Sequence, residues 1–123
     1  MVNNPVIWFE IYVQDMDRAK AFYESVFEVT LQQLNSPGID LWSFPMTMDR
    51  TGAGGALAKM EGVASGGNSV IIYFSCSDCA VEAERAAKHG GQVHREKMSI
   101  GEYGFIALIL DTEGNMIGLH SLQ

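Results

Sequence analysis

The sequence DTEGNMIGLH, residues 111–120, has a near copy in DRTGAGGALA, residues 49–58. Each begins with Asp, has Gly three positions later, and continues through a small residue into Leu, with the two copies 62 residues apart. A second pair of landmarks, Asp15 and Asp78, lies 63 residues apart, and each precedes a predicted helix. Two separate offsets that agree within one residue indicate an internal repeat, and a repeat constrains the whole architecture.

Each half carries the same order of predicted elements. Asp residues are good N-caps, and apolar residues then recur at helical spacing, which predicts helices over 16–27 and 79–89. β-rich stretches bounded by Gly, Pro and Asn predict the strands. These predicted strands are 6–13, 29–34, 39–44 and 56–60 in the first half, and 69–75, 92–97, 105–110 and 115–121 in the second.

These patterns predict an α+β fold of two βαβββ-like modules within one domain spanning residues 1–123. Module one covers about 5–61 and module two about 69–123, joined by a Gly- and Ser-rich linker at 62–68. A single module cannot cover both faces of its sheet, so we expect the two to pair and form a cupped sheet around a central pocket.

Composition excludes several classes of function. The net charge of −7 disfavours phosphate backbones, so nucleic acid is not an expected partner. No apolar run approaches the ~20 residues needed to span a bilayer, so no membrane partner is expected either. The first residues lack the basic and apolar regions of a signal peptide, which makes the cytoplasm the expected location.

The two cysteines, Cys76 and Cys79, have C-x-x-C spacing. Such spacing can mark a redox or metal pair. No second pair and no histidines at matching spacing accompany them, and no basic residue lies close by in sequence. Two ordinary thiols at a strand end are therefore the expectation.

Two segments resemble the vicinal-oxygen-chelate superfamily of glyoxalases, bleomycin-resistance proteins and extradiol dioxygenases. Residues 8–23, WFEIYVQDMDRAKAFY, resemble its strand, aspartate turn and helix. Residues 111–119, DTEGNMIGL, resemble its last hairpin, with Thr112 and Gly118 as departures. The resemblance covers nearly the whole chain and implies this fold and a homodimer. It does not specify a function, because the superfamily includes several enzymes and also binding proteins.

The resemblance also locates the positions that hold metal ligands in metal-using members. These positions fall on Trp8, Ala56, Ile71 and Gly118. None of these residues offers the oxygen or nitrogen donor that a divalent ion requires. We therefore expect no metal site and no cofactor, and glyoxalase or dioxygenase chemistry through a metal at these positions is not expected.

Strand alternation predicts which other side chains share the pocket face. Residues two apart on a strand point the same way, which places Glu10, Tyr12, Ala58, Tyr73 and His120 with the former ligand positions. Glu10 and His120 are the ionisable candidates among these residues. If they lie within hydrogen-bond distance of each other, they could act as a general acid–base pair. The alternatives are a buried structural pair and a pair that orients a ligand.

Aromatic residues on the strands predict a lined cavity for a flat organic ligand. The candidates for ligand binding are Trp8, Tyr12, Trp42, Tyr73 and Tyr103. Ordinary sheet packing is the alternative, most clearly for Trp42, whose face the sequence does not define. The loop 99–104, with Gly on both sides of Glu102 and Tyr103, is a candidate flap or a plain loop.

Three functional hypotheses follow. The first is a glyoxalase-like protein that binds a small organic molecule in an aromatic-lined, metal-free pocket. The second is a lyase, isomerase or dioxygenase-type enzyme of the same superfamily, using Glu10 and His120 or a metal site not recognisable in the sequence. The third is a module that serves association, in which the cup has no ligand.

Overall fold

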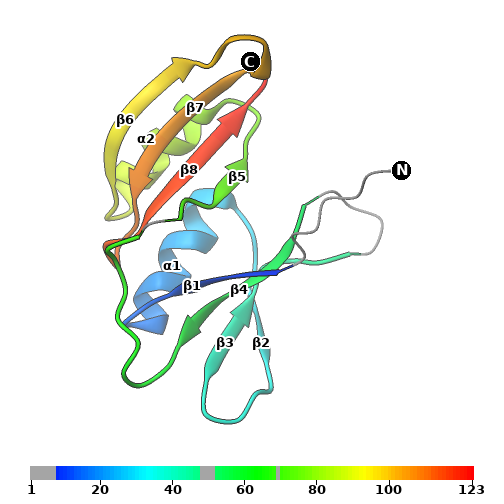
Figure 1. Cartoon of the computed structure of the whole chain (residues 1–123), viewed down its shortest axis with the longest axis vertical. Helices are drawn as coiled ribbons and strands as arrows, with labels where there is room; N and C mark the ends of the chain where they lie inside the picture. The colour runs from blue at the N-terminus through cyan, green and yellow to red at the C-terminus, as the bar shows by residue number, and fades with distance from the viewer. Residues whose placement is uncertain (1–7, 48–51, 69) are drawn as a thin grey trace.

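A computed structural model of the chain describes residues 8–47, 52–68 and 70–123. It contains two four-stranded sheets and two α-helices, the α+β fold of two similar modules that the sequence predicts (Figure 1). The first module contains β1 (Trp8–Tyr12), α1 (Met16–Phe27), β2 (Gln32–Leu34), β3 (Asp40–Ser43) and β4 (Gly54–Lys59). The second contains β5 (Tyr73–Ser75), α2 (Cys79–Lys88), β6 (Gln92–Ser99), β7 (Phe105–Leu110) and β8 (Met116–Ser121).

The two sheets have the same topology. Their strand orders are β1-β4-β3-β2 and β5-β8-β7-β6, so the first strand of each module lies at one edge beside the last. That pair is parallel and the other pairs are antiparallel. Glu10 lies opposite Ala56 in the first sheet, and Tyr73 lies opposite Gly118 in the second. The repeat in the sequence is therefore also a repeat of strand pairing.

The helix boundaries follow from local capping. The side chains of Asp15 and Asp78 cap α1 and α2 as predicted, each accepting a backbone N–H at 3.0 Å. Helix α1 ends at Glu28, whose φ of 55° is left-handed. The chain then folds back on the helix, and the N–H of Leu31 donates to the carboxylate of Glu24 at 2.9 Å. This contact explains why strand β2 is shorter than the predicted 29–34.

One apolar core serves both modules. It joins the inner face of α1, the inner face of α2 and one face of each sheet. Aromatic rings mark the junction: Phe74 of the second module stacks on Phe27 of the first with centroids 4.7 Å apart, and it lies 5.6 Å from Phe44. The opposite face of each sheet points away from α1 and α2.

A buried polar cluster also ties the modules together. The carboxylate of Glu113, in the turn before β8, accepts hydrogen bonds from the backbone N–H groups of Gln14 and Asp15, each at 3.0 Å, and from Arg18 at 2.6 and 2.8 Å. Burial by itself raises the pKa of Glu113, but these hydrogen bonds and one from the Thr112 hydroxyl outweigh it and hold the pKa at about 2. The cluster fixes the end of β1 against the second module.

No described helix is both long and apolar enough to cross a bilayer.

Candidate functional site

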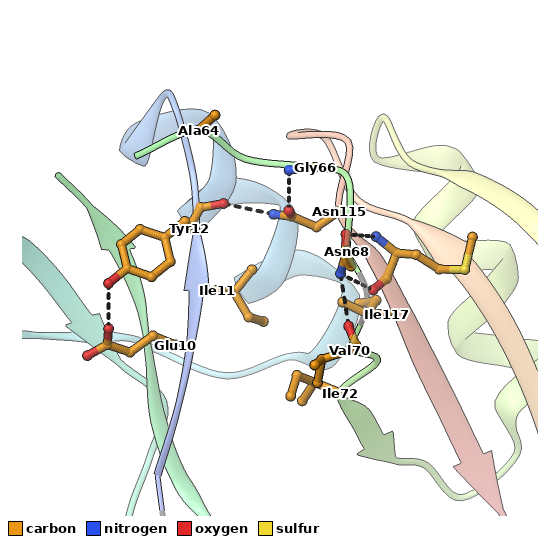
Figure 2. A pocket seen from close by; sticks show the side chains of 11 residues that line it. Glu10, Ile11, Tyr12, Ala64, Gly66, Asn68, Val70, Ile72, Asn115 and Ile117 are labelled. Atoms are coloured by element: carbon orange, nitrogen blue, oxygen red, sulfur yellow. Dashed lines mark hydrogen bonds between the residues drawn. The ribbon is translucent and has the colours of Figure 1, made fainter. Parts of the chain in front are cut away.

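A groove of about 240 Å³ runs beside β1, where the first sheet meets the connection between the modules, which is the segment between β4 and β5 (Figure 2). One wall is β1, and the other is the connection that leads into β5 and the start of β8. The groove is lined by Glu10, Ile11, Tyr12, Ala64, Gly66, Asn68, Val70, Ile72, Asn115, Met116 and Ile117. Its volume is slightly below the ~300 Å³ at which ligand pockets usually begin.

Three alternate residues of β1, Trp8, Glu10 and Tyr12, form a hydrogen-bonded row, and two of them, Glu10 and Tyr12, line this groove. The indole N–H of Trp8 donates to Oε2 of Glu10 at 3.1 Å, and the hydroxyl of Tyr12 donates to Oε1 at 2.8 Å. The hydrogen bond to the Glu10 carboxylate, with burial and the charge of that group, raises the pKa of Tyr12, so its hydroxyl stays a donor. The alternation predicted for Trp8, Glu10 and Tyr12 thus corresponds to direct contacts along one face.

The opposite wall is held by two asparagines. Asn115 donates from Nδ2 to the carbonyl of Tyr12 at 2.9 Å and accepts from the N–H of Gly66 at 2.7 Å. Asn68 donates to the carbonyl of Met116 at 2.9 Å and accepts from its N–H at 3.3 Å. Side chains rather than a strand ladder therefore position this wall, as Figure 2 shows.

Asn68, Asn115 and the connection were not among the site residues predicted from the sequence. Gly- and Ser-rich composition at 62–68 is typical of a flexible linker, and it gives no indication of a wall. A signal did exist in the last hairpin, where Asp111, Glu113 and Asn115 alternate and all three are buried. Alternate polar residues at a predicted turn can mark a buried polar cluster rather than a solvated loop.

The residues at the superfamily's metal-ligand positions do not fit a divalent ion. Ala56 is fully buried and Ile71 is apolar, while the indole N–H of Trp8 is a donor already directed at Glu10. At Gly118 the ring of Tyr73 occupies the space of a side chain, since an added Cβ would lie 2.3 Å from it. Among the described residues, no group of three or more His, Cys, Asp and Glu could hold a metal.

Glu10 and His120 lie on different sheets and line different grooves. His120 lies on β8 and faces a second hollow of about 530 Å³ at the end of that strand. The residues around this hollow are Ser75, Cys76, Ser77, His120, Ser121, Leu122 and Gln123. Glu10 instead bonds to its neighbours on β1. Within one chain, the two candidates for acid–base chemistry are therefore in separate places.

The remaining aromatic candidates are also dispersed. Trp42 lies on the helix-covered face of its sheet, where the Lys20 ammonium sits 3.2 Å from the ring centroid. The Tyr73 ring covers Gly118 on the second sheet and is 49% exposed. Tyr103 ends the short 3₁₀ turn Gly101–Tyr103, and its side chain lies outside the described residues. Among the aromatic candidates whose side chains the structure describes, Trp8 and Tyr12 contact Glu10.

The cysteines show none of the features of a reactive pair. Both are free thiols. Burial, together with the charge of Glu82, raises the pKa of Cys76 to about 12, and Cys79 is fully buried at the start of α2. A thiol with a raised pKa is a poor nucleophile near neutral pH.

The strand pairing and shared core define a two-module α+β fold with a groove at the junction of the modules. Residues 6–119 match the model of the Glyoxalase/Bleomycin resistance protein/Dioxygenase superfamily, and the chain belongs to that superfamily.

Similar proteins agree on this fold. The protein CFP32 of Mycobacterium tuberculosis and Mycobacterium bovis, whose name describes it provisionally as a glyoxylase, is 30% identical over 109 residues. That match covers 89% of this chain but only 41% of CFP32, so the chain spans less than half of these relatives.

Two crystal structures match with low identity. A mutant of glyoxalase I from Zea mays matches with a TM-score of 0.73 and 20% identity, over 95% of this chain and 46% of that one. TnmS3, an antibiotic-binding protein from a Streptomyces species, matches with a TM-score of 0.70 and 21% identity, over 100% of this chain and 99% of that one. At these identities the likeness concerns the fold.

Proposed function

We propose that this chain is a glyoxalase-like protein that binds a small organic molecule at the aromatic and acidic face of β1, without a metal at the superfamily's ligand positions. The observation that carries the proposal is the ordered row of Trp8, Glu10 and Tyr12, of which Glu10 and Tyr12 line the groove. A few fixed polar groups among aromatic rings are what small-molecule sites usually present. The likeness of the whole chain to an antibiotic-binding protein also supports the binding of a small molecule.

The proposal includes a homodimer. Trp8 is 38% exposed and Tyr73 is 49% exposed, each on the face of its sheet that no helix covers. These side chains offer apolar area that a second copy of the chain would cover. A second copy that places its second sheet over the first sheet of its partner would deepen the groove and bring His120 toward a partner's Glu10. Sedimentation of the purified protein is expected to give twice the mass of the chain.

Binding is tested with a library of flat heteroaromatic compounds, by ligand-observed NMR. We expect hits that the wild type binds and that Trp8→Ala no longer binds. Trp42→Phe is the control, because Trp42 lies on the opposite face against Lys20. Loss of binding in both variants, or in neither, would contradict the assignment of the site to β1.

The metal-free state and the role of His120 need separate measurements. Metal analysis of protein purified without chelator is expected to show no stoichiometric zinc, nickel, manganese or iron. His120→Ala is expected to weaken ligand binding if the partner copy completes the site. An unchanged affinity in a stable monomer would contradict the two-copy site, and stoichiometric metal would contradict the metal-free one.

A further inference from the structure

The Glu10 carboxylate is fixed in orientation but not saturated. Each oxygen accepts one hydrogen bond, from Trp8 on one side and Tyr12 on the other. A carboxylate has about four acceptor positions, so the donors of the described residues leave half of them open to another donor. The residue is exposed, and Figure 2 shows its carboxylate beside the Tyr12 hydroxyl.

Among the described residues, no positive charge lines the groove beside Glu10. It is the one charged residue in the lining of the groove among the residues that the structure describes. Strand pairing places only neutral or apolar residues on the same face of the sheet, at positions 32, 34, 41, 43, 54, 56 and 58. The basic side chains of α1 are engaged elsewhere, Arg18 with Glu113 and Lys20 with Trp42.

The flanking rings select the kind of cation. Trp8, which is 38% exposed, and Tyr12 present apolar rings with a negative π-face, and such rings attract an organic cation more than a small hydrated one. A bare metal ion would need several oxygen or nitrogen donors, and the described residues offer no such group here. A carboxylate also repels an anionic ligand at short range.

We propose that the groove beside Trp8, Glu10 and Tyr12 selects a cationic organic ligand, a protonated amine or amidine carried on a flat apolar ring. The cationic group donates to the open positions of the Glu10 carboxylate, while the ring lies against the aromatic side chains. This assignment rests on the proposed function and names the ligand class for the same site. The net charge of −7 also favours the approach of a cation.

The test uses three probes that share one ring: 2-naphthylmethylamine, 2-naphthylmethanol and 2-naphthoate. The chain has two tryptophans, so it gives two indole N–H signals in an NMR titration. Trp8→Phe and Trp42→Phe assign them, and the Trp42 signal then reports on the integrity of the fold. Variants Glu10→Gln and Glu84→Gln each remove one negative charge, but Glu84 lies on α2 in an exposed pair with Lys88.

For the wild type at low salt, we expect the amine to shift the Trp8 signal and to bind at least about fivefold more tightly than the alcohol, with naphthoate weakest. Glu10→Gln is expected to abolish this preference and Glu84→Gln to keep it. Added salt is expected to reduce the preference in the wild type.

Two results would overturn the proposal, and they have different consequences for the proposed binding function. Equal binding of amine and alcohol at Trp8, or a preference that survives Glu10→Gln, refutes selection by charge and leaves small-molecule binding intact. No shift of the Trp8 signal by any of the probes at millimolar concentration refutes the cationic site, and the heteroaromatic library then decides the proposed function separately.

Discussion

Arg18 and Glu113, which are 95 residues apart in the sequence, form an ion pair with Nε and Oε2 separated by 2.6 Å. The Glu113 side chain is fully buried, whereas half of the Arg18 side chain is exposed. Because Arg18 belongs to the first module and Glu113 to the second, this pair fixes the modules relative to each other. It also fixes the wall of the groove, since Glu113 holds the backbone just after β1.

Replacing the buried carboxylate should destabilise the protein. Glu113→Gln removes the charge that Arg18 and two backbone N–H groups face, and we expect a loss of about 2 kcal/mol in the free energy of unfolding. Glu84→Gln is the control, since the exposed Glu84–Lys88 pair at 3.5 Å should contribute less than about 0.5 kcal/mol. Urea unfolding measures both, and equal losses would contradict the role of Glu113.

Stability should also depend on acid through Glu113. Its pKa is lowered from 4.5 to about 2 in the folded chain, so the folded state favours the ionised form. The resulting stabilisation is present above the pKa of the unfolded chain and is lost as pH falls from about 4.5 toward 2.

The measurement is the difference in unfolding free energy between wild type and Glu113→Gln. It should be constant above about pH 5.5 and shrink as the solution is acidified toward pH 3. If this free-energy difference stays the same or grows on acidification, the Glu113 carboxylate is not the source of the acid-dependent stability.

A second buried hydrogen bond joins the modules at Tyr23. Its hydroxyl donates to Oδ2 of Asp111 at 2.7 Å, and burial raises its pKa well above the ordinary value, so it remains protonated. Tyr23→Phe leaves a buried carboxylate with one donor fewer, and we expect a cost of about 1–3 kcal/mol. Tyr73→Phe, on an exposed ring, should cost little. Thermal unfolding distinguishes them, and similar melting temperatures would disprove the claim.

Gly104, just before β7, cannot accept a side chain. Its φ is 106°, and an added Cβ would lie 2.4 Å from the carbonyl oxygen of Ser121. Gly104→Ala should therefore cost about 2 kcal/mol or more through backbone strain and displacement of the end of β8. Gly54→Ala is the comparison, because its nearest obstacle is the flexible Met46 sulfur at 2.7 Å, which can move away. We expect its cost to be below about 1 kcal/mol, and the reverse order would be incompatible with these contacts.

The local elements were predictable because their signals are local. Asp15 and Asp78 cap helices at the predicted residues, and the repeated Asp–Gly segments precede β4 and β8, which are the equivalent strands of the two sheets. The boundaries that differ depend on contacts across space. Strand β2 begins only at Gln32 because Glu24 holds the N–H of Leu31, an interaction that no local pattern indicates.

The site was predictable only along one strand. Alternation placed Trp8, Glu10 and Tyr12 together, and they are in contact. The same reasoning grouped them with His120 on another strand, which lines a separate groove in the single chain. Alternation reports the face of a strand but not the orientation of one sheet toward another.

The sequence by itself determined the two-module fold, because capping residues, strand alternation and a repeat of 62–63 residues act through neighbours in the chain. It also determined that the four superfamily ligand positions hold no metal-binding side chain. Only the tertiary structure decided that Glu113 holds Arg18 and that Asn115 closes the groove against Tyr12. It also decided that Trp42 faces a helix while Trp8 faces solvent. Such contacts depend on how the shared core orients the two modules, and side-chain packing across distant segments sets that orientation.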